Sequence, residues 1–258
     1  MVTTHTQPQR KLGKLPAVHD KRTLLLAKYM SPERERSLRT PPLSVRWSRK
    51  TDQYWPMFAN DTVGDCTCAT AGHLIQAWTA NAQAEEFEPA TKDVLAMYYA
   101  ISGYIPGRPE TDVGAACLDV LRYWRKKGCG GHKIGAFAAV SPRSKQDVRD
   151  AIWLFGGAYV GLQLPLSAQD QTTWSVPRGG AQGAGEPGTW GGHAVPLIDY
   201  DPRGLWCVTW GGLKRLTWSF LATYADEAYA IISEDFLTGG KAPNGFDAAT
   251  LQADLSRL

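Results

Sequence analysis

Cys66 stands at a place in the sequence where a thiol could become a nucleophile. It follows a turn-rich stretch at 60–65 and opens a segment, up to Ala80, in which Ala, Leu, Ile, Gln and Trp predominate. This composition predicts a helix that begins near Cys66. The dipole at a helix N-terminus favours the thiolate and lowers a cysteine pKa below its free value of about 8.5. Asp65, directly beside the thiol, acts in the opposite direction.

Thiol chemistry also needs a base, a donor for the oxyanion and usually a polar group that orients the base. His193, at the start of the strand-like segment HAVPLIDY, has the residue type of a base. His73 lies on the same helical face as Cys66, seven residues later. The distance along the helix axis is then about 10.5 Å, which is too far for proton transfer. We interpret His73 as a core or surface histidine.

Two segments resemble those that carry the catalytic pair of the papain-like cysteine peptidases. NDTVGDCTCATAGHLIQAW is similar to the family's nucleophile segment, in which a Gln six residues before the Cys supplies the oxyanion donor. Asn60 takes the place of this Gln with an amide that is one methylene shorter, and Gly64 matches the glycine two residues before the Cys. GGHAVPLIDYD resembles the family's histidine strand, which implies that His193 is the base.

The resemblance covers residues 42–235 and contains one departure. VTWG, which begins at Val208, is similar to the family motif Asn-Ser-Trp-Gly, so the triad Asn falls on Val208, a non-polar residue. Thr209 is a weak polar candidate, because strand alternation predicts that it points to the opposite face. Asp199 should lie about 20 Å from His193 along the same strand. Without an evident third member, we predict weak activity rather than none.

The same resemblance assigns further residues to the lining of a cleft. Gly64 and Asp65 precede the thiol, and Trp210 and Trp218 match the family's aromatic shield over the histidine. Trp190 belongs to a long glycine-rich loop, and loops of this length inside a compact domain are usually functional. Its indole could line a substrate cleft or only anchor the loop.

The elements that must position these residues change in character along the chain. Helical patterns come first, with further helices expected at 91–102, at 113–127 and from the capping pattern Ser144–Asp147 to Gly156. Strand patterns follow in AYVGLQLPL, in a hairpin of HAVPLIDY and LWCVTW, and in EAYAII. This order predicts the α+β class. With the resemblance, it predicts a papain-like two-lobed fold, in which a helical lobe carries Cys66 and an antiparallel, barrel-like β lobe carries His193.

The N-terminal segment has its own composition. Residues 1–50 contain 12 Lys and Arg against 3 Asp and Glu, whereas the rest of the chain contains 16 against 22. We expect residues 1–45 to form an extended basic strap that packs on the acidic body or on an acidic partner, with a solvated tail as the alternative. A papain-like domain at 46–240 and a tail at 241–258 with a short helix complete the chain. A strap over the cleft would act as an inhibitory pro-segment.

The cysteine count and the hydropathy limit the remaining possibilities. The five cysteines are an odd number, and Cys66 and Cys68 are too close to join distant segments, so we expect free thiols, with Cys117, Cys129 and Cys207 in the core. The chain lacks the ligand spacing of a zinc site, and the expected chemistry needs no cofactor. It also lacks a long apolar run and a signal sequence. We therefore expect a cytoplasmic protein, with virion association as an alternative.

The main functional hypothesis is a cysteine-type peptidase, or a related thiol acyl-transfer hydrolase, acting on a peptide or protein in the cleft. Cys66 would attack the carbonyl, His193 would carry the proton, and Asn60 with the Cys66 backbone N–H would bind the oxyanion. A transglutaminase-like or amidase activity could use the same pair. A third hypothesis is a weak or inert papain-like module that serves as a binding or structural part of an assembly, for example a phage particle, through its basic strap.

Overall fold

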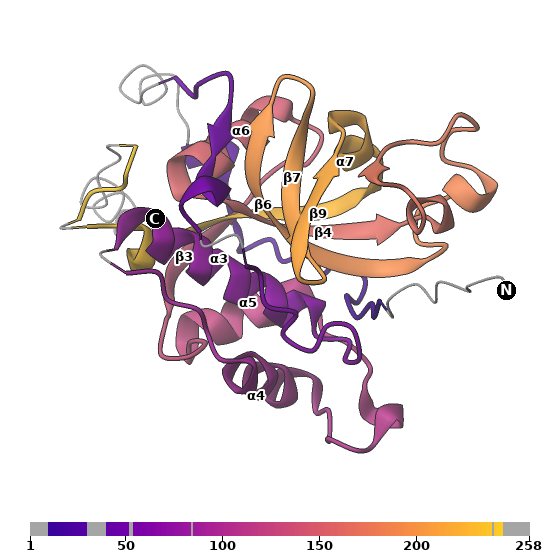
Figure 1. The fold of residues 1–258 in the computed structure, drawn as a ribbon, viewed down its shortest axis with the longest axis horizontal. Helices are drawn as coiled ribbons and strands as arrows, with labels where there is room; N and C mark the ends of the chain where they lie inside the picture. The colour runs from indigo at the N-terminus through magenta and orange to yellow at the C-terminus, as the bar shows by residue number, and fades with distance from the viewer. Residues whose placement is uncertain (1–9, 30–39, 52–53, 84, 239, 245–258) are drawn as a thin grey trace, which may run out of the picture.

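The structure, a computed structural model, describes residues 10–29, 40–51, 54–83, 85–238 and 240–244. The described residues form a helical part and a sheet (Figure 1). The first three long helices are α3 (Cys66–Ala82), α4 (Thr91–Ser102) and α5 (Cys117–Lys126), and they precede the long strands in the chain. This arrangement confirms the α+β class.

Helix α3 is the central element of the helical part. All but two of its 17 residues are buried, because it packs against α4, against α5 and against strand β6 (Gly191–Asp201). Its buried hydroxyl groups bond to the helix itself: Thr70 donates to the Cys66 carbonyl at 2.8 Å, and Thr79 donates to the Ile75 carbonyl at 2.9 Å. Such back-bonding satisfies polar groups that would otherwise be costly in a core.

The other helices agree with the sequence prediction except at one end. Helix α4 has the expected bounds, and α6 (Lys145–Phe155) begins after Ser144, whose hydroxyl accepts a hydrogen bond from the Asp147 backbone N–H. Helix α5 begins at Cys117 and not at 113. Ala115 and Ala116, directly before it, are extended because the Ala115 backbone forms hydrogen bonds with the N-terminal strap, in place of a first helical turn.

Within the residues that the structure describes, the sheet has nine strands, in the order β1-β3-β9-β4-β6-β7-β8-β5 with β2 paired to β6. The strands not yet introduced are β1 (Leu24–Leu25), β2 (Val45–Arg46), β3 (Ile134–Ala139), β4 (Ala158–Leu164), β5 (Thr173–Trp174), β7 (Gly204–Thr209), β8 (Gly212–Leu216) and β9 (Ala225–Ser233). The long strands pair antiparallel as predicted. The two-residue strands β1 and β5 pair in parallel, so the sheet is mixed. A short helix, α7 (Trp218–Tyr224), joins β8 to β9.

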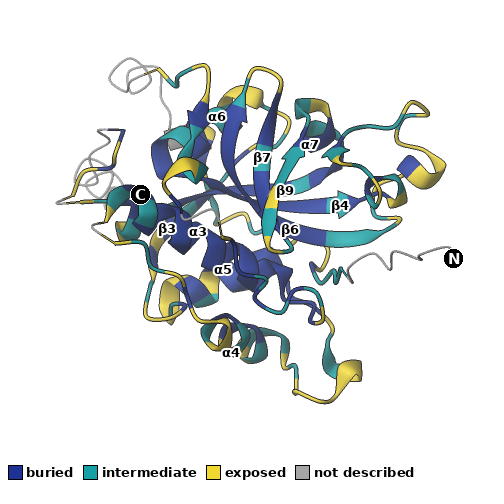
Figure 2. Cartoon of the chain, viewed as in Figure 1, coloured by how far each residue is buried: buried dark blue, intermediate teal, exposed yellow. Residues whose placement is uncertain are grey.

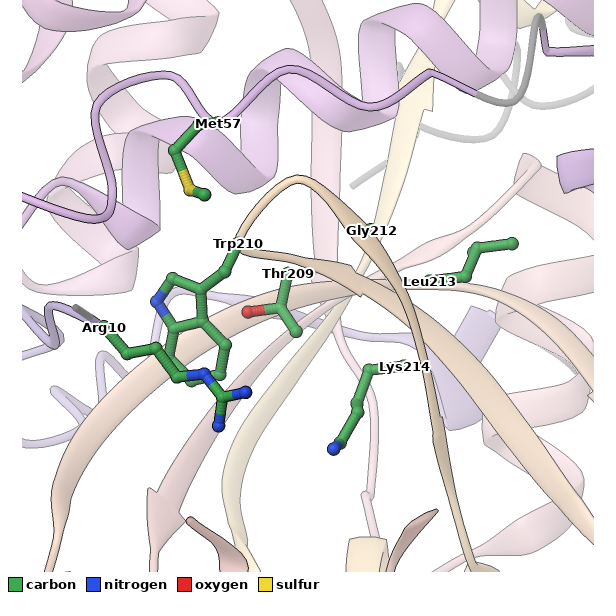
Figure 3. Close-up of a pocket in the computed structure, with 7 residues that line it drawn as sticks. All are labelled: Arg10, Met57, Thr209, Trp210, Gly212, Leu213 and Lys214. Carbon is green, nitrogen blue, oxygen red and sulfur yellow. The ribbon is translucent and has the colours of Figure 1, made fainter. Parts of the chain in front are cut away.

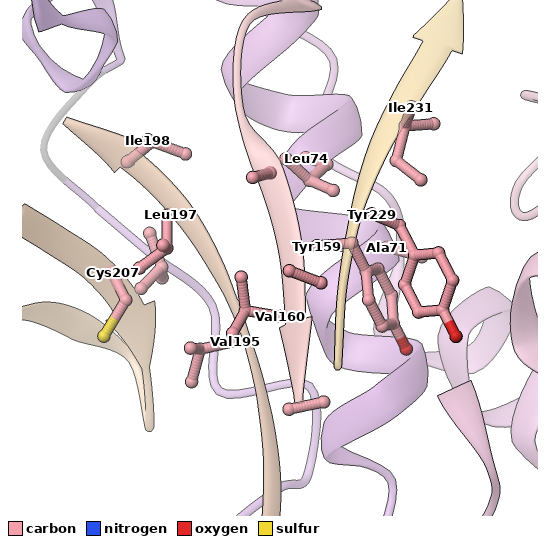
Figure 4. Packing of buried hydrophobic residues seen from close by; sticks show 14 of the residues in the cluster. Ala71, Leu74, Tyr159, Val160, Val195, Leu197, Ile198, Cys207, Tyr229 and Ile231 are labelled. Atoms are coloured by element: carbon pink, nitrogen blue, oxygen red, sulfur yellow. The ribbon is translucent and has the colours of Figure 1, made fainter. Parts of the chain in front are cut away.

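The core lies between α3 and the central strands, which are buried along most of their length (Figure 2). Figure 4 shows buried side chains of α3, β4, β6 and β9 that belong to one hydrophobic cluster, among them Leu74, Val160, Leu197 and Ile231. Each fully buried aliphatic side chain of this kind stabilises the fold by about 1.5–3 kcal/mol. The Tyr159 hydroxyl also donates to the Thr67 carbonyl at 2.7 Å, which ties β4 to the first turn of α3.

The described parts of the N-terminal strap follow the body and do not form a core of their own. Strand β1 pairs with β3, Leu26 is buried in the common core, and β2 pairs with β6. The short helix expected in the C-terminal tail lies outside the described residues, since their last range ends at 244. Within the described ranges, every helix is too short or too polar to cross a bilayer.

Candidate active site

The thiol of Cys66 lies at the first residue of α3, as the sequence predicts, and it is closed off from solvent. The residue is 1% exposed. The pKa of the thiol is raised to about 12: burial, the largest effect, and the Asp65 carboxyl raise it, whereas backbone groups of Ala194 and Gly13 and the charge of Lys14 lower it. The sulfur therefore lies against two segments that are far apart in the sequence: the strand of His193 and the N-terminal strap.

His193 is buried in β6, one residue before Ala194. It is 1% exposed, and burial lowers the pKa of its imidazole to about 3. Its Nε2 lies 2.7 Å from the Thr209 hydroxyl oxygen, and its ring stacks on Trp210 with 4.3 Å between centroids and 10° between planes. Within the described part of the chain, Nδ1 has no hydrogen-bond partner, so the ring is oriented through one nitrogen while the other is left unengaged.

The contact between His193 and Thr209 corrects two predictions about the third position. Thr209 does not point away from His193, and Val208 instead belongs to the hydrophobic core. Simple alternation fails here because the pairing of β6 with β7 shifts register between Leu197 and Asp199, and because the strand ends at Thr209. Asp199 is occupied elsewhere, as an acceptor for the backbone N–H and the hydroxyl of Ser48.

Asn60 lies in the turn that leads into α3. The residue is 3% exposed, and its amide donates to the Val63 carbonyl at 3.2 Å. The turn is tight, with positive φ angles of 53° at Phe58 and 69° at Ala59. One amide hydrogen of Asn60 is thus used within its own turn, and a role as oxyanion donor depends on the other.

Asp65 is fully buried at the N-cap position of α3, without a side-chain cap hydrogen bond. Neither of its carboxyl oxygens has a hydrogen-bond partner among the described residues. Burial raises the pKa of Asp65 well above its usual value, and the nearby Asn60 amide offsets this only in part. A raised pKa favours the neutral carboxyl, which does not repel a thiolate, and this weakens the conflict that the sequence suggested.

The tryptophans expected at the cleft fall into two groups. Trp190 stacks on Trp210 at 5.5 Å, and the buried Trp174 meets Trp210 edge-on at 6.1 Å, so both support the ring that covers His193. Trp218 does not belong to this shield. Strand β8 leads away from Trp210 to the other end of the hairpin, where the Trp218 indole donates to the Asp201 carbonyl and packs near Tyr200.

Residues 10–15 of the strap, here called the cleft segment, contact the surroundings of both Cys66 and His193. On the helical side, the Lys11 N–H donates to the Asn60 carbonyl at 3.2 Å, and the Gly13 carbonyl accepts from Ala115 at 2.9 Å. On the β side, the Lys14 N–H donates to the Gly192 carbonyl at 3.1 Å. The Trp210 indole N–H donates to the Lys11 carbonyl at 3.2 Å.

The cleft segment lies so close to the body that only glycine fits at two of the contacts, one position in the segment and one in the body. A Cβ at Gly13 would lie 1.8 Å from the Gly64 carbonyl oxygen, and a Cβ at Gly192 would lie 2.1 Å from the Lys14 carbonyl oxygen. Beyond it, a pocket of about 200 Å³ remains beside Thr209 and Trp210, with Arg10 over the indole at 5.4 Å (Figure 3). The basic charge of the strap indicated a contact with the body, but the sequence did not indicate where.

Comparisons with known proteins identify the fold. No family model and no curated protein matches the sequence. Xylellain, a cysteine protease from Xylella fastidiosa, is similar in structure with a TM-score of 0.65 and 16% identity, over 90% of this chain and 99% of that one. The Carica candamarcensis cysteine protease CMS1MS2, solved in complex with E-64, gives a TM-score of 0.52 and 12% identity, over 74% of this chain and 99% of that one.

A third neighbour is the structure of the cysteine protease and lectin-like domains of Cwp84, a surface layer associated protein of Clostridium difficile. It gives a TM-score of 0.56 and 11% identity, over 88% of this chain and 57% of that one. None of the three is described as part of a phage particle. The chain has the fold of the papain-like cysteine proteases.

Proposed function

We propose that the protein is a cysteine peptidase in a latent form, with Cys66 as nucleophile, His193 as base and the cleft segment as the part that closes the site. The observation that carries this proposal is the environment of His193. Its Nε2 is held by Thr209, its Nδ1 is unengaged, and the next residue of its strand, Ala194, contacts the Cys66 thiol.

Thr209 supplies the orientation that the triad asparagine would give. A threonine hydroxyl can accept a hydrogen bond from Nε2–H, and this tautomer leaves the lone pair on Nδ1. In the proposed reaction, this lone pair accepts the proton of the Cys66 thiol. The stacked indole of Trp210 restricts rotation of the ring and keeps water from Nε2, so the hydrogen bond to Thr209 is not exchanged for one to solvent.

The reaction follows from these groups. The Cys66 sulfur attacks the carbonyl carbon of a peptide bond while its proton passes to His193, and the negative oxygen that results is held by the Cys66 backbone N–H and the side-chain amide of Asn60. The C–N bond then breaks, and His193 gives the proton to the departing amine. Water, deprotonated by His193, hydrolyses the thioester and regenerates the thiol.

Latency follows from burial. With the cleft segment in place, the thiol pKa is raised to about 12 and the imidazole pKa is lowered to about 3, so both groups are neutral. Release of the segment would admit water and substrate, which stabilises the charged forms and moves the two pKa values toward each other. The ion pair of thiolate and imidazolium then becomes accessible.

Hydrolysis by a full-length Gly13→Val variant tests this function. Because a Cβ at Gly13 would overlap the Gly64 backbone, valine should displace the cleft segment without shortening the chain. We expect this opened chain to cleave a fluorogenic peptide library, and Cys66→Ala in the same background to abolish cleavage. Gly179→Val is the matched control, since Gly179 is exposed and a Cβ there meets no atom within 4 Å.

The outcomes separate the peptidase from the inert module. If the opened chain and its Cys66→Ala version are indistinguishable on the library, and E-64 does not label Cys66, the peptidase assignment is wrong. E-64 is a suitable probe because the structure of the neighbour CMS1MS2 was solved in complex with it. Transfer to an added amine without hydrolysis would instead support the acyl-transfer alternative.

A further inference from the structure

The side chain of Lys14 occupies a closed acidic pocket next to the candidate nucleophile. It is 0% exposed, and its Nζ lies 2.8 Å from Asp226 Oδ2 and 3.1 Å from Glu227 Oε1. The neighbouring residue of the chain, Gly13, meets the Cys66 thiol. A basic side chain is therefore bound one residue away from the position that faces Cys66.

The pocket is shaped for a long, unbranched aliphatic stem that ends in a cation. Gly161 of β4 forms one wall, where a Cβ would lie 2.1 Å from Lys14 Cε. Glu227 is itself fixed by the Tyr229 hydroxyl, which donates to its Oε2 at 2.8 Å, and Asp226 is fixed by the Gln163 amide at 2.7 Å. Both carboxylates are thus held in place by the β lobe, independently of the strap.

The charges around the pocket favour a bound cation. Burial alone lowers the pKa of Lys14, but Cys117, Glu227 and Asp226 raise it by more, and the net pKa lies above its ordinary value. Burial keeps the Cys117 thiol neutral by raising its own pKa, so the two carboxylates are the charges that face Lys14 at neutral pH. Without a cation, Glu227, which is 5% exposed, would be a buried and uncompensated charge.

We propose that this pocket selects peptide substrates with a lysine or arginine side chain, and that Lys14 occupies it in the latent form as a substitute for that side chain. The proposal rests on the proposed peptidase function and specifies its substrate class. When the cleft segment leaves, a basic substrate residue restores the ion pairs with Asp226 and Glu227, while a neutral residue of the same length leaves both carboxylates uncompensated.

The test compares peptides that differ only in charge. The enzyme is the full-length Gly13→Val/Lys14→Ser variant, so that Lys14 cannot refill the pocket. Each peptide pair carries lysine or norleucine, or arginine or citrulline, at one scanned position. We expect a kcat/KM preference for the charged member of about tenfold or more at one position, because loss of a partner to a buried charge is costly. Equal rates for both members at every position would overturn the proposal.

Variants of the carboxylates assign the preference to this pocket. In the same background, Glu227→Gln and Asp226→Asn should each reduce the ratio of lysine to norleucine rates, and the double substitution should bring it close to one. Glu234→Gln, at an exposed carboxylate outside the pocket, should leave the ratio unchanged. A ratio that survives the double substitution would place the source of the preference elsewhere and overturn the assignment.

A binding measurement keeps this proposal separate from the proposed function. If the opened chain hydrolyses no peptide, the peptidase function fails, but the pocket can still be tested. Fluorescence polarisation with the Cys66→Ala version of the opened chain should show roughly tenfold tighter binding of the lysine peptide than of the norleucine peptide. Equal dissociation constants would overturn the pocket proposal, whatever the result for hydrolysis.

Discussion

The two sides of the candidate active site are prepared to different degrees. On the β face, His193 already has an orienting hydrogen bond with Thr209 and a stacked indole, both from the β lobe itself. On the helical face, the Cys66 thiol is enclosed by the strap as well as by its own lobe, and burial raises its pKa. If the proposed function holds, activation therefore requires a change at the strap, while the side chain of His193 is already oriented.

Removing either member of the candidate pair should have the largest effect on this comparison. In the opened chain, Cys66→Ala and His193→Ala should each lower kcat/KM by about a thousandfold or more, because the nucleophile and the base act as a unit. The double substitution should then cost no more than either single one. Steady-state kinetics on one peptide measures all three, and additive losses would show that the two residues do not act together.

Thr209→Val should have the next largest effect. Valine keeps the volume but removes the hydroxyl that orients His193, so we expect kcat in the opened chain to fall by roughly 10–100-fold. An unpaired, buried Nε2–H should also cost about 1–3 kcal/mol of unfolding free energy. Thr209→Ser retains the hydroxyl and should preserve most of the activity. A Thr209→Val variant with wild-type kcat would mean that Trp210 alone orients the ring.

Val208→Asn tests whether position 208, and not Thr209, is the third position of the site. The family motif places an amide at this position, but the Val208 side chain lies in the hydrophobic core. We expect asparagine there to reduce the free energy of unfolding by about 1–3 kcal/mol, with no gain in kcat. Chemical denaturation and peptide hydrolysis measure the two quantities, and a rise in turnover would restore Val208 as the third position.

A smaller effect, on the pH dependence of stability, is expected at His73, which is buried like His193 but lies outside the proposed site. Burial lowers the pKa of His73 to about 4, and its Nε2 is held by the Pro56 carbonyl at 2.8 Å. Between the unfolded pKa of 6.5 and the folded value of about 4, the unfolded chain binds the extra proton, so stability falls as the pH falls. His73→Gln should reduce this slope by about 1.4 kcal/mol per pH unit.

Urea denaturation at a series of pH values measures that slope. His73→Gln should leave hydrolysis by the opened chain unchanged at neutral pH, since His73 is outside the proposed site. An unchanged slope would mean that His73 already takes up its proton in the folded protein.

The sequence predicted the local features of the site better than its long-range contacts. The helix at Cys66 and the strand at His193 depend on nearby residues, and both were predicted. The contact of Thr209 with His193 was not, because it depends on a register shift in the pairing of β6 with β7 that alternation cannot reveal.

The cleft segment shows the same limit more strongly. Its position depends on backbone hydrogen bonds to residues about 50 to 180 positions away, such as Asn60, Ala115 and Gly192. Composition indicated that a basic strap would meet an acidic body. It could not indicate that Lys14 would enter a pocket with Asp226 and Glu227, since those carboxylates are brought together with Gly161 only by the sheet.

The rate at which E-64 labels Cys66 tests the central claim most directly, namely that a competent thiol is closed off by the cleft segment. Intact wild-type, Gly13→Val and Gly179→Val chains are compared at neutral pH, with peptide mass spectrometry to identify the labelled cysteine. We expect Gly13→Val to be labelled at Cys66 at least about tenfold faster than the other two, because release of a buried thiol restores its thiolate fraction. Equal rates in all three chains, or labelling at cysteines other than Cys66, would contradict the account.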